Sequence, residues 1–482
     1  SDDPVSISYN LRIGSSSGGN DLLSSSLPAH VNNVGPLLVR EFNEIPHGNY
    51  YWSVQSVDAA GVRSKWSDEE SLFISRLVPS TQSLPGVYFS TAGWGDYNKD
   101  NLLDLALTGI TFSGGSITNL FRNDGGLLNQ DFAQNIEAVF GGHLSLVDYT
   151  NDGKLDVSLS GFQIINFQPF PATVFYKWSD GTYIKDPQKS VTYDAYGYDM
   201  GYNGGSNNHS WGDYDNDGDV DLVAGGVDFY GNRHLKVFKN NQGTLEHDLK
   251  QTDLLPLFPC MVHWCDMNRD GFLDLVTVGA DSNGLLFTQV YLNSPNYILK
   301  KSLLLFKGDL GVTAGSFDFG DYNNDGYIDF AITGKNSQND LITYIIRNYG
   351  SQIEPEVINL KGVFSGRPSW GDYDNDGDLD LVVSGFSNVN GSEPISIIYK
   401  QDDGAFNLDA TLSLDGVGYS FTDWGDYDSD GDLDLFLAGF KENEDVVAKV
   451  YDNLEGIQNP NIPPNAPYGL DDSSISGDQI TL

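Results

Sequence analysis

Long apolar runs are what this 482-residue sequence most clearly lacks. It contains no stretch of about 18 apolar residues, and no basic segment is followed by the short apolar core of a secretory signal. We therefore expect no membrane-spanning segment and no signal peptide. Because the first residue is Ser rather than Met, we also expect a piece of a longer, multidomain chain.

Basic residues are also scarce. The 26 Lys and Arg residues face 67 Asp and Glu residues, which gives a formal net charge of −41 at pH 7. A surface of this sign repels nucleic acids and anionic membranes, and it attracts divalent cations. The balance argues against a nucleic-acid or membrane partner and indicates calcium-rich surroundings.

Only two cysteines are present, Cys260 and Cys265, and both lie on one predicted extended segment. Five extended residues span roughly 16 Å, whereas a disulfide tolerates a Cα separation of only about 7 Å. We predict two free, buried thiols. Their number says little about the redox compartment.

What the sequence does contain is one acidic loop that occurs seven times. Its clearest copy is DYDNDGDLDL, from Asp372 to Leu381. Successive copies are separated by 52, 65, 53, 55, 51 and 54 residues, so a unit of about 55 residues repeats along the chain. The first carboxylates of the seven copies are Asp96, Asp148, Asp213, Asp266, Asp321, Asp372 and Asp426.

The surroundings of the loops predict the fold. An apolar strand ending in Trp-Gly or a variant precedes each loop, and a strand with Gly five residues after the last carboxylate follows it. A third strand and a looser fourth strand complete each unit. We predict an all-β fold, a seven-bladed β-propeller of four-stranded blades with a calcium loop in each blade. The Trp residues are predicted core between blades: Trp94, Trp211, Trp264, Trp370 and Trp424.

We place the propeller at residues 76–457. The seventh unit ends after its third strand, while residues 76–84 stand where every other unit has its fourth strand. We therefore predict that residues 76–84 close the ring, which removes two exposed sheet edges.

The two ends of the chain differ from the repeats. Residues 1–75 read as short strands and resemble the C-terminal part of a fibronectin type III domain, a β-sandwich, with Tyr51 and Trp52 as core aromatics. Residues 458–482 resemble a linker and the opening strands of a second such domain.

Oxygen-bearing side chains fill positions 1, 3, 5 and 9 of each loop, position 6 is usually Gly, and position 7 can offer its backbone carbonyl. This hard-oxygen set is typical of calcium, and no Cys or His stands at the spacing that zinc requires. The alternative is a solvated acidic turn, but carboxylates ~4 Å apart near a protein surface repel by about 4 kcal/mol. The predicted ligands are Asp96, Asn98, Asp100, Leu102, Asp104; Asp148, Thr150, Asp152, Lys154, Asp156; Asp213, Asp215, Asp217, Asp219, Asp221; Asp266, Asn268, Asp270, Phe272, Asp274; Asp321, Asn323, Asp325, Tyr327, Asp329; Asp372, Asp374, Asp376, Asp378, Asp380; Asp426, Asp428, Asp430, Asp432 and Asp434.

Two loops depart from the pattern. Asn101 replaces the turn Gly, which Asn tolerates, and Thr150 is a weaker ligand than Asp or Asn. We expect up to seven calcium ions, with the Asp148 site the weakest.

With these ligands and spacings, residues 76–454 resemble the FG-GAP/VCBS repeats of calcium-binding seven-bladed propellers, an architecture shared with integrin α-subunit heads. The resemblance implies an extracellular protein, secreted or displayed at the cell surface, with structural calcium. The flanks resemble those of large bacterial surface proteins. No particular ligand is implied.

A ligand is expected on the face opposite the calcium loops, where integrin-like heads bind theirs. The longest interval between loops adds a Tyr-rich insertion there, and aromatics among Gly, Asn and Asp suit stacking on sugars or gripping a protein. The alternative is an insertion that packs on itself. The candidate residues are Tyr193, Tyr196, Tyr198, Tyr202, Phe167, Phe170, Phe229 and Tyr230.

These observations favour a non-enzymatic, calcium-stabilised binding or adhesion module for a glycan or a protein. Two alternatives stay open, a polysaccharide lyase or hydrolase and a purely structural spacer. An enzyme requires two carboxylates, or a His and a Tyr, that converge outside the calcium loops. His143, His209 and His263 each precede a loop by a few residues, but without a carboxylate at matched spacing they are weak evidence for catalysis.

Overall fold

A computed structural model describes most of the chain. The described residues are 8–17, 48–57, 64–74, 76–165, 168–187, 208–228, 230–302, 311–350, 352–356, 358, 360–402, 404–442 and 445–454. They form strands and turns and contain no helix, and so no helix able to cross a membrane. The chain divides into two compact units, which we describe separately.

The N-terminal unit is one antiparallel sheet of β1 (Ser8–Gly14), β2 (Gly48–Val57) and β3 (Glu70–Ile74). Arg12 lies over the Trp66 ring at 5.1 Å from its centroid and pairs with Glu69 at 3.2 Å.

The predicted core aromatics of this unit need correction. Tyr51 and Trp52 are only half-buried, and Tyr50 is the buried aromatic of β2. The fibronectin type III assignment and the boundary at residue 75 stay predictions.

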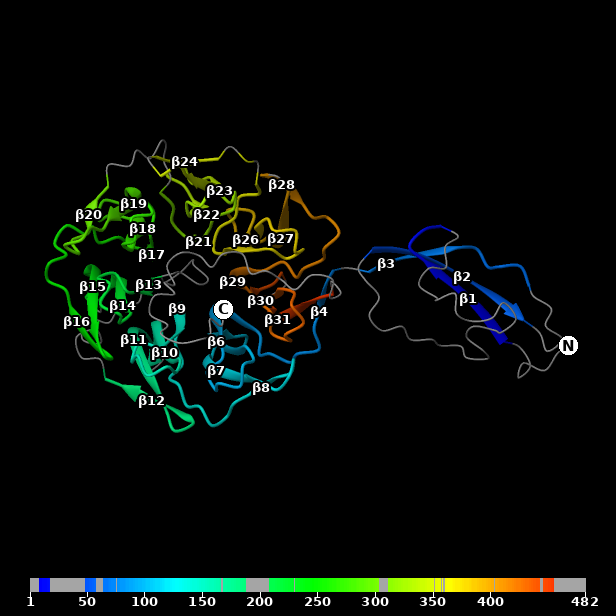
Figure 1. Cartoon of the computed structure of the whole chain (residues 1–482), viewed down its shortest axis with the longest axis horizontal. Helices are drawn as coiled ribbons and strands as arrows, with labels where there is room; N and C mark the ends of the chain where they lie inside the picture. Colours follow the sequence, from blue (N-terminus) through cyan, green and yellow to red (C-terminus); the bar gives the residue numbers. More distant parts are fainter. Residues whose placement is uncertain are drawn as a thin grey trace. The chain divides into compact units, whose positions relative to one another are not determined.

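The larger unit consists of four-stranded antiparallel sheets that follow one another around a ring, as in a β-propeller (Figure 1). Seven such sheets lie within the described residues. The first strands, nearest the ring centre in Figure 1, are β5 (Val87–Gly95), β9 (Phe140–Val147), β13 (His209–Gly212), β17 (Cys260–Cys265), β21 (Phe317–Gly320), β25 (Pro368–Gly371) and β29 (Gly418–Gly425). The second strands are β6 (Asp104–Thr111), β10 (Asp156–Ile165), β14 (Asp221–Val227), β18 (Asp274–Ala280), β22 (Asp329–Lys335), β26 (Asp380–Phe386) and β30 (Asp434–Phe440).

The outer strands of each sheet follow in chain order. The third strands are β7 (Ser116–Asn123), β11 (Gln168–Ser179), β15 (Arg233–Asn241), β19 (Leu286–Leu292), β23 (Leu341–Asn348), β27 (Pro394–Asp402) and β31 (Val446–Asn453). The fourth strands are β8 (Leu128–Gln130), β12 (Thr182–Asp186), β16 (Thr244–His247), β20 (Lys300–Lys301), β24 (Ile353–Pro355), β28 (Ala405–Leu408) and, from the start of the chain, β4 (Leu77–Pro79).

The core lies between neighbouring sheets. Every residue of β14 and of β26 is buried, because a second strand is covered by a sheet on each side. The loop Trp residues belong to this core: Trp211 stacks on Tyr149 of the preceding sheet at 5.4 Å, and Trp264 stacks on Tyr214 at 5.3 Å. These contacts confirm the prediction that the Trp residues pack between sheets.

The glycine near the end of each second strand is required by a close approach of backbone. At Gly279 φ is +155°, and a Cβ atom there would lie 1.9 Å from the Pro259 carbonyl oxygen. The chain that enters the first strand therefore crosses directly over this glycine, and a larger residue would displace it.

The first and last sheets of the series also meet. The Ser80 N–H donates to the Val450 carbonyl at 2.9 Å, next to β4 in the sheet β29-β30-β31-β4. Val87 and Leu105 of the first sheet share one hydrophobic cluster with Phe436 of the last. Closure leaves neither sheet with an open face; residues 76–457 as a domain boundary stay a prediction.

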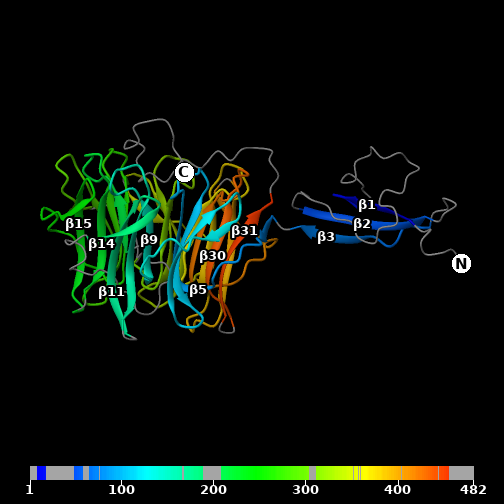
Figure 2. The same ribbon diagram turned by 90° about the horizontal axis from the view of Figure 1, so that it is seen from below.

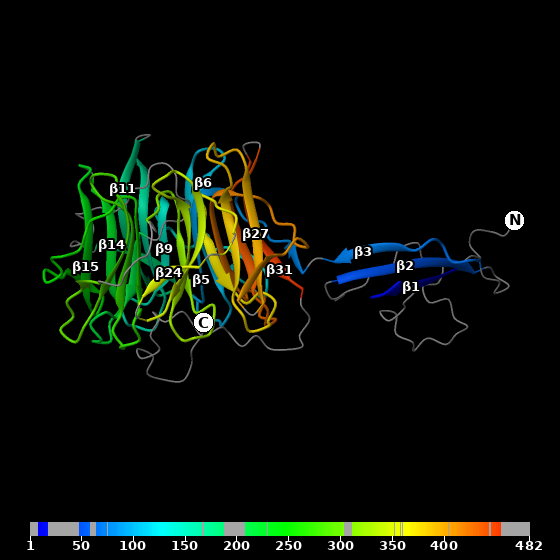
Figure 3. The ribbon, with the colours of Figure 1, turned by 90° about the horizontal axis from the view of Figure 1, so that it is seen from above.

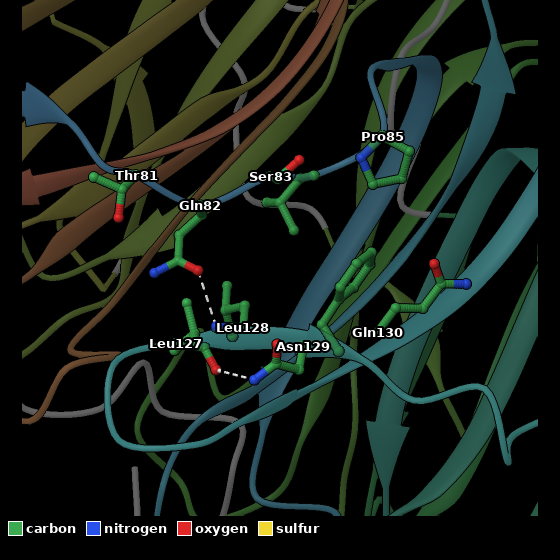
Figure 4. A pocket seen from close by; sticks show the side chains of 10 residues that line it. Thr81, Gln82, Ser83, Pro85, Leu127, Leu128, Asn129 and Gln130 are labelled. Atoms are coloured by element: carbon green, nitrogen blue, oxygen red, sulfur yellow. Dashed lines mark hydrogen bonds between the residues drawn. The ribbon is translucent and has the colours of Figure 1, made fainter.

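A cavity of about 500 Å³ lies where the closing segment passes β8 (Figure 4). The Gln82 side chain spans it, accepting from Leu128 N at 2.9 Å and donating to the Gly126 carbonyl at 2.7 Å. The lining residues are Thr81, Gln82, Ser83, Leu84, Pro85, Phe121, Leu127, Leu128, Asn129 and Gln130, none of them titratable. The cavity therefore lies at the junction where the ring closes, and its lining offers no acid or base for catalysis.

The prediction of free thiols is confirmed. Cys260 and Cys265, at the two ends of β17, are both buried and unbridged. Burial raises the pKa of the Cys260 thiol to about 12, so the thiol stays protonated and unreactive.

Candidate metal centres

All seven acidic loops connect the first strand of a sheet to its second. Because antiparallel strands alternate in direction, the loops lie at one end of the ring and the turns between second and third strands lie at the other. Figures 2 and 3 show the strands from the side, running between these two ends.

The first carboxylate of each loop is fixed by the backbone of the turn. Asp213 accepts from the N–H groups of Asp217 (3.0 Å) and Gly218 (2.9 Å). The same pair of bonds occurs at Asp96, Asp148, Asp266, Asp321 and Asp372. In the last loop, Gly431 N donates to Asp426 at 3.2 Å. The turn therefore holds this carboxylate inside the loop.

The ninth carboxylate anchors the loop to the third strand. Asp221 is fully buried, and its Oδ1 accepts from Asn240 N at 2.7 Å. Equivalent bonds reach Asp104, Asp156, Asp274, Asp329 and Asp380. Each loop is thus tied to its own sheet on both sides.

In three loops the carboxylates converge on one point. The ligand atoms of Asp213, Asp215 and Asp221 lie within 4.8 Å of one another. Equivalent clusters are formed by Asp372, Asp374 and Asp380, and by Asp426, Asp428 and Asp434. The other four loops have Asn or Thr at the third position, so their carboxylates stand only at positions 1, 5 and 9.

Buried oxygens without a partner show that a cation fits these clusters. Oδ1 of Asp215, Oδ2 of Asp221 and Oδ1 of Asp426 are buried and have no hydrogen-bond partner among the described residues. A buried, unpartnered carboxylate oxygen is costly unless a cation compensates it. Several oxygens around one point are the ligand set of hard divalent ions.

Burial raises the pKa values of the ninth carboxylates. The pKa of Asp221 and that of Asp380 are raised to about 9, first by burial and then by the neighbouring loop carboxylates. The same causes raise the pKa of Asp329 to about 8 and that of Asp274 to about 7. A bound divalent ion favours the ionised form and would lower these pKa values.

Four loops have a basic side chain on a predicted ligand. In the Asp148 loop, Lys154 Nζ lies 3.2 Å from Asp152. Lys239 Nζ pairs with Asp215, and Lys400 Nζ pairs with Asp374 and, at 3.1 Å, with Asp376.

In the Asp321 loop the contact with a basic side chain is weaker. Arg347 reaches Asp325 at 3.3 Å and shares its guanidinium with Glu356 at 3.5 Å.

A second set of charged residues lies where the first strands meet. Arg367, directly before β25, is flanked by Asp318 of β21, whose Oδ1 lies 3.6 Å from Nη2, and by Asp423 of β29. It also acts electrostatically on His143 of β9 and His263 of β17. Because these residues come from five sheets, they converge near the ring axis, and we call them the axial cluster.

Burial raises the pKa of both carboxylates of the axial cluster. Burial raises the pKa of Asp423 to about 6, while Arg367 lowers it and Asp318 raises it. The pKa of Asp318 is raised by burial, and Asp318 also accepts from Trp370 N at 2.9 Å. Two carboxylates therefore converge outside the metal loops.

The three histidines are neutral. His209 is buried among Ser145, Ser158 and Ser160, whose hydroxyls lie 2.7–3.2 Å from its ring nitrogens, and burial lowers its pKa to about 3. Burial lowers the pKa of His263 to about 4. His209 is a hydrogen-bonded core residue, since its ring nitrogens are already taken.

Three segments match the FG-GAP-like repeat. They are residues 213–277, 266–332 and 321–383, and each spans two successive acidic loops. The match covers the centre of the larger unit. No curated protein shows significant similarity to the chain.

Solved structures resemble the chain only distantly. A GH43_1 enzyme from Xanthomonas citri complexed with xylose is 12% identical, over 51% of this chain and 86% of that one, with a TM-score of 0.30. Trypanosoma rangeli sialidase is 10% identical, over 82% and 56%, with a TM-score of 0.32. An ancestral GH74 enzyme is 10% identical, over 85% and 56%, with a TM-score of 0.33.

One prediction is corrected here. The sequence favoured a non-enzymatic chain, whereas the solved structures that resemble it include enzymes of GH43 and GH74 and a sialidase. These enzymes contradict the prediction that the chain is not an enzyme. At these TM-scores the similarity assigns no reaction to the chain.

The candidate ligand-binding residues fall mostly outside the described residues. This applies to Tyr193, Tyr196, Tyr198, Tyr202, Phe167 and Phe229. Phe170 lies on the hairpin of β10 and β11, and Tyr230 lies in the turn between β14 and β15 with an exposed fraction of 85%. Both belong to the end of the ring opposite the metal loops.

Sequence reasoning missed the amides that join neighbouring sheets. Asn240 Nδ2 donates to the Tyr149 carbonyl of the preceding loop at 2.7 Å, and Asn123 closes the ring by donating to Tyr427 at 2.5 Å. The bonded amides, which we call latch amides, are Asn123, Asn240, Asn293, Asn348 and Gln401. An Asn that recurs 19 residues after the ninth carboxylate was the available signal.

Proposed function

We propose that the chain is an extracellular seven-bladed propeller that binds calcium in its acidic loops and presents a carbohydrate-binding surface at the opposite end of the ring. The calcium assignment rests on the three converging carboxylate clusters and their unpartnered buried oxygens. In each loop the residues that would hold the ion are those at positions 1, 3, 5 and 9. Bound calcium supplies the positive charge that keeps these carboxylates ionised and the turn closed.

Exposed apolar side chains support a binding surface opposite the loops. Phe112, Ile164, Tyr230 and Leu285 lie in or beside the turns between second and third strands of four successive blades. Phe112 is 69% exposed and Tyr230 is 85% exposed. Aromatic rings at the rim of a polar surface stack on sugar rings, and apolar side chains placed at one end mark an interaction site.

A glycan array with calcium present tests the binding surface. We expect Phe112→Ala and Tyr230→Ala to lose binding at least about tenfold, since each removes an exposed ring. Tyr349→Ala, on the β23–β24 turn at the loop end, is the matched control and should bind as the parent does. Equal loss in the control variant would contradict the proposed surface, and no binding to any glycan would favour a protein ligand or a structural spacer.

A second candidate function, carbohydrate hydrolysis, is favoured by the axial cluster. Asp423, with its pKa of about 6, carries a proton in mildly acidic solution, and Asp318 lies beside Arg367, with its Oδ1 3.6 Å from Nη2. Glycoside hydrolysis uses such a pair: the acid protonates the leaving oxygen as the C–O bond breaks, and the carboxylate takes the proton of the attacking water.

Reducing-end release from a panel of polysaccharides tests the second candidate. The parent should release reducing ends, and Asp423→Asn should abolish this release. Asp180→Asn, on an exposed turn, is the control and should retain it. Glycan binding with no release of reducing ends, at pH 5 and at pH 7, would reject hydrolysis.

A further inference from the structure

The residue before each latch amide lies beside the metal loop of its own sheet. The latch N–H bonds the ninth carboxylate, as Asn240 N does with Asp221 and Gln401 N with Asp380, at 2.7 Å and 2.8 Å. The preceding side chain is thereby placed next to the loop. In β15 that residue is Lys239, and in β27 it is Lys400.

In both loops the lysine ammonium group lies on a carboxylate that a bound metal ion would use as a ligand. Lys239 contacts Asp215, the third-position ligand, and its Nζ lies 5.4 Å from the centroid of the Tyr214 ring. The Asp215 side chain is only 7% exposed, so this ion pair is largely shielded from water.

Lys400 makes the equivalent contact with Asp374, whose side chain is 5% exposed. It also reaches Asp376 at 3.1 Å and Asp402 at 3.7 Å. One ammonium thus already serves two predicted ligands of this loop.

In β23 the equivalent residue is Arg347, which reaches Asp325 at 3.3 Å, and in β7 it is Arg122, which pairs with Asp124 rather than with a loop residue. Two other third strands have no basic residue at this position. The equivalent residue is Leu292 in β19 and Asp452 in β31, neither of them basic. In β11, Lys177 pairs with Asp186 at 2.9 Å rather than with a loop residue. The Asp426–Asp434 loop therefore has a converging carboxylate cluster without a lysine from its third strand.

We propose that Lys239 and Lys400 are internal counter-cations that compete with calcium for their loops. The inference rests on the proposed calcium binding and ranks the sites. An ion entering the Asp213 or Asp372 loop must displace an ammonium group from the third-position carboxylate, whereas an ion entering the Asp426 loop meets no lysine from its own third strand, where Asp452 stands at the equivalent position. The Asp426 loop fills first, and the two lysines hold their own loops closed when calcium is scarce.

Calcium titration of the whole chain, by calorimetry with an ion count from native mass spectrometry, tests the ranking. Lys239→Met and Lys400→Met keep the aliphatic stem and remove the charge, so each is expected to tighten one site by at least about tenfold. Lys177→Met is the control and should leave every affinity unchanged. A gain in affinity in Lys177→Met as large as that in Lys239→Met would overturn the proposal, because it would reflect net charge alone.

The converse variant installs the competitor. Asp452→Lys should weaken the Asp426 site at least about tenfold, because Asp428 offers the new ammonium a third-position carboxylate, while Asp452→Asn should weaken it far less. If the parent binds no calcium, the proposed function fails. If the parent binds calcium and the lysine variants bind it with the same affinity at every site, the proposed competition by lysine fails and the proposed calcium binding stands.

Discussion

The metal loops and the axial cluster both bury carboxylates, but they balance the charge differently. At the axis, Asp318 and Asp423 share Arg367, so a positive charge is part of the chain. In the Asp426 loop, buried oxygens converge with no basic residue at the equivalent position of the third strand. The comparison teaches that the chain supplies a counter-charge to the buried carboxylates at the ring centre, whereas its third strand supplies none to the Asp426 loop.

The largest expected effect is removal of that ion. Excess chelator should lower the melting temperature by at least about 10 °C, since each loop occupied at 100 times Kd contributes roughly 2.7 kcal/mol. Differential scanning calorimetry in millimolar calcium and then in EGTA measures the shift, with metal content determined in parallel. An unchanged melting temperature in a protein that holds no metal would sink the calcium assignment.

Breaking the axial cluster should cost stability with or without calcium. Arg367→Met leaves two buried carboxylates without their counter-charge, and we expect a loss of about 3–5 kcal/mol in the free energy of unfolding. Arg122→Met, which removes an exposed pair with Asp124, is the control and should cost at most about 1 kcal/mol. Denaturant unfolding measures both. Rescue of Arg367→Met by calcium would show that the two regions are not independent.

The pH dependence should separate the metal-free from the loaded protein. In the folded, metal-free chain the pKa of Asp221 and of Asp380 is about 9, well above that of an unfolded Asp. The stability linked to these protons is complete below about pH 4 and is lost as the pH rises through 9. We expect metal-free protein to be less stable at pH 8 than at pH 5, and calcium to remove or reverse this trend. Thermal melts at both pH values, with and without EGTA, give the result; a metal-free trend that rises with pH would contradict the shifts.

The smallest effect concerns the joints between sheets. Asn240→Ala removes the bonds to the Tyr149 and Val220 carbonyls and should cost about 1–3 kcal/mol. Asn129→Ala, whose amide bonds the exposed Asp124, should change stability by no more than about 0.5 kcal/mol. An equal loss of unfolding free energy in the two variants would show that the Asn240 bonds between sheets stabilise the fold no more than an exposed amide does.

Much of the fold could be predicted because it repeats along the chain. The Asp-rich loop marks the end of one strand and the start of the next, so the bounds of β14 and β26 follow from Asp221 and Asp380. The Trp packing followed too, because a large apolar residue at one register in every unit must face a neighbouring sheet.

Contacts between units could not be predicted in this way. Arg367 aligns with no other basic residue, and its partners Asp318 and Asp423 come from sheets about 50 residues away in either direction. They meet because the first strands β21, β25 and β29 of three successive sheets lie side by side. The pairing of Lys239 with Asp215, in contrast with Lys177 and Asp186, depends on side-chain geometry that spacing alone does not determine.

The latch amides make the ring a circular chain of neighbours. Asn240 holds the ninth carboxylate of its own loop through its N–H and the preceding loop through its side chain, so a shift in one loop is passed to the next. In β11 the corresponding residue is Trp178, which meets Tyr97 of the preceding loop edge to face at 5.3 Å. A displacement of one loop can therefore reach both of its neighbours through these bonds, and Trp178 is the position where a ring contact replaces the side-chain amide bond.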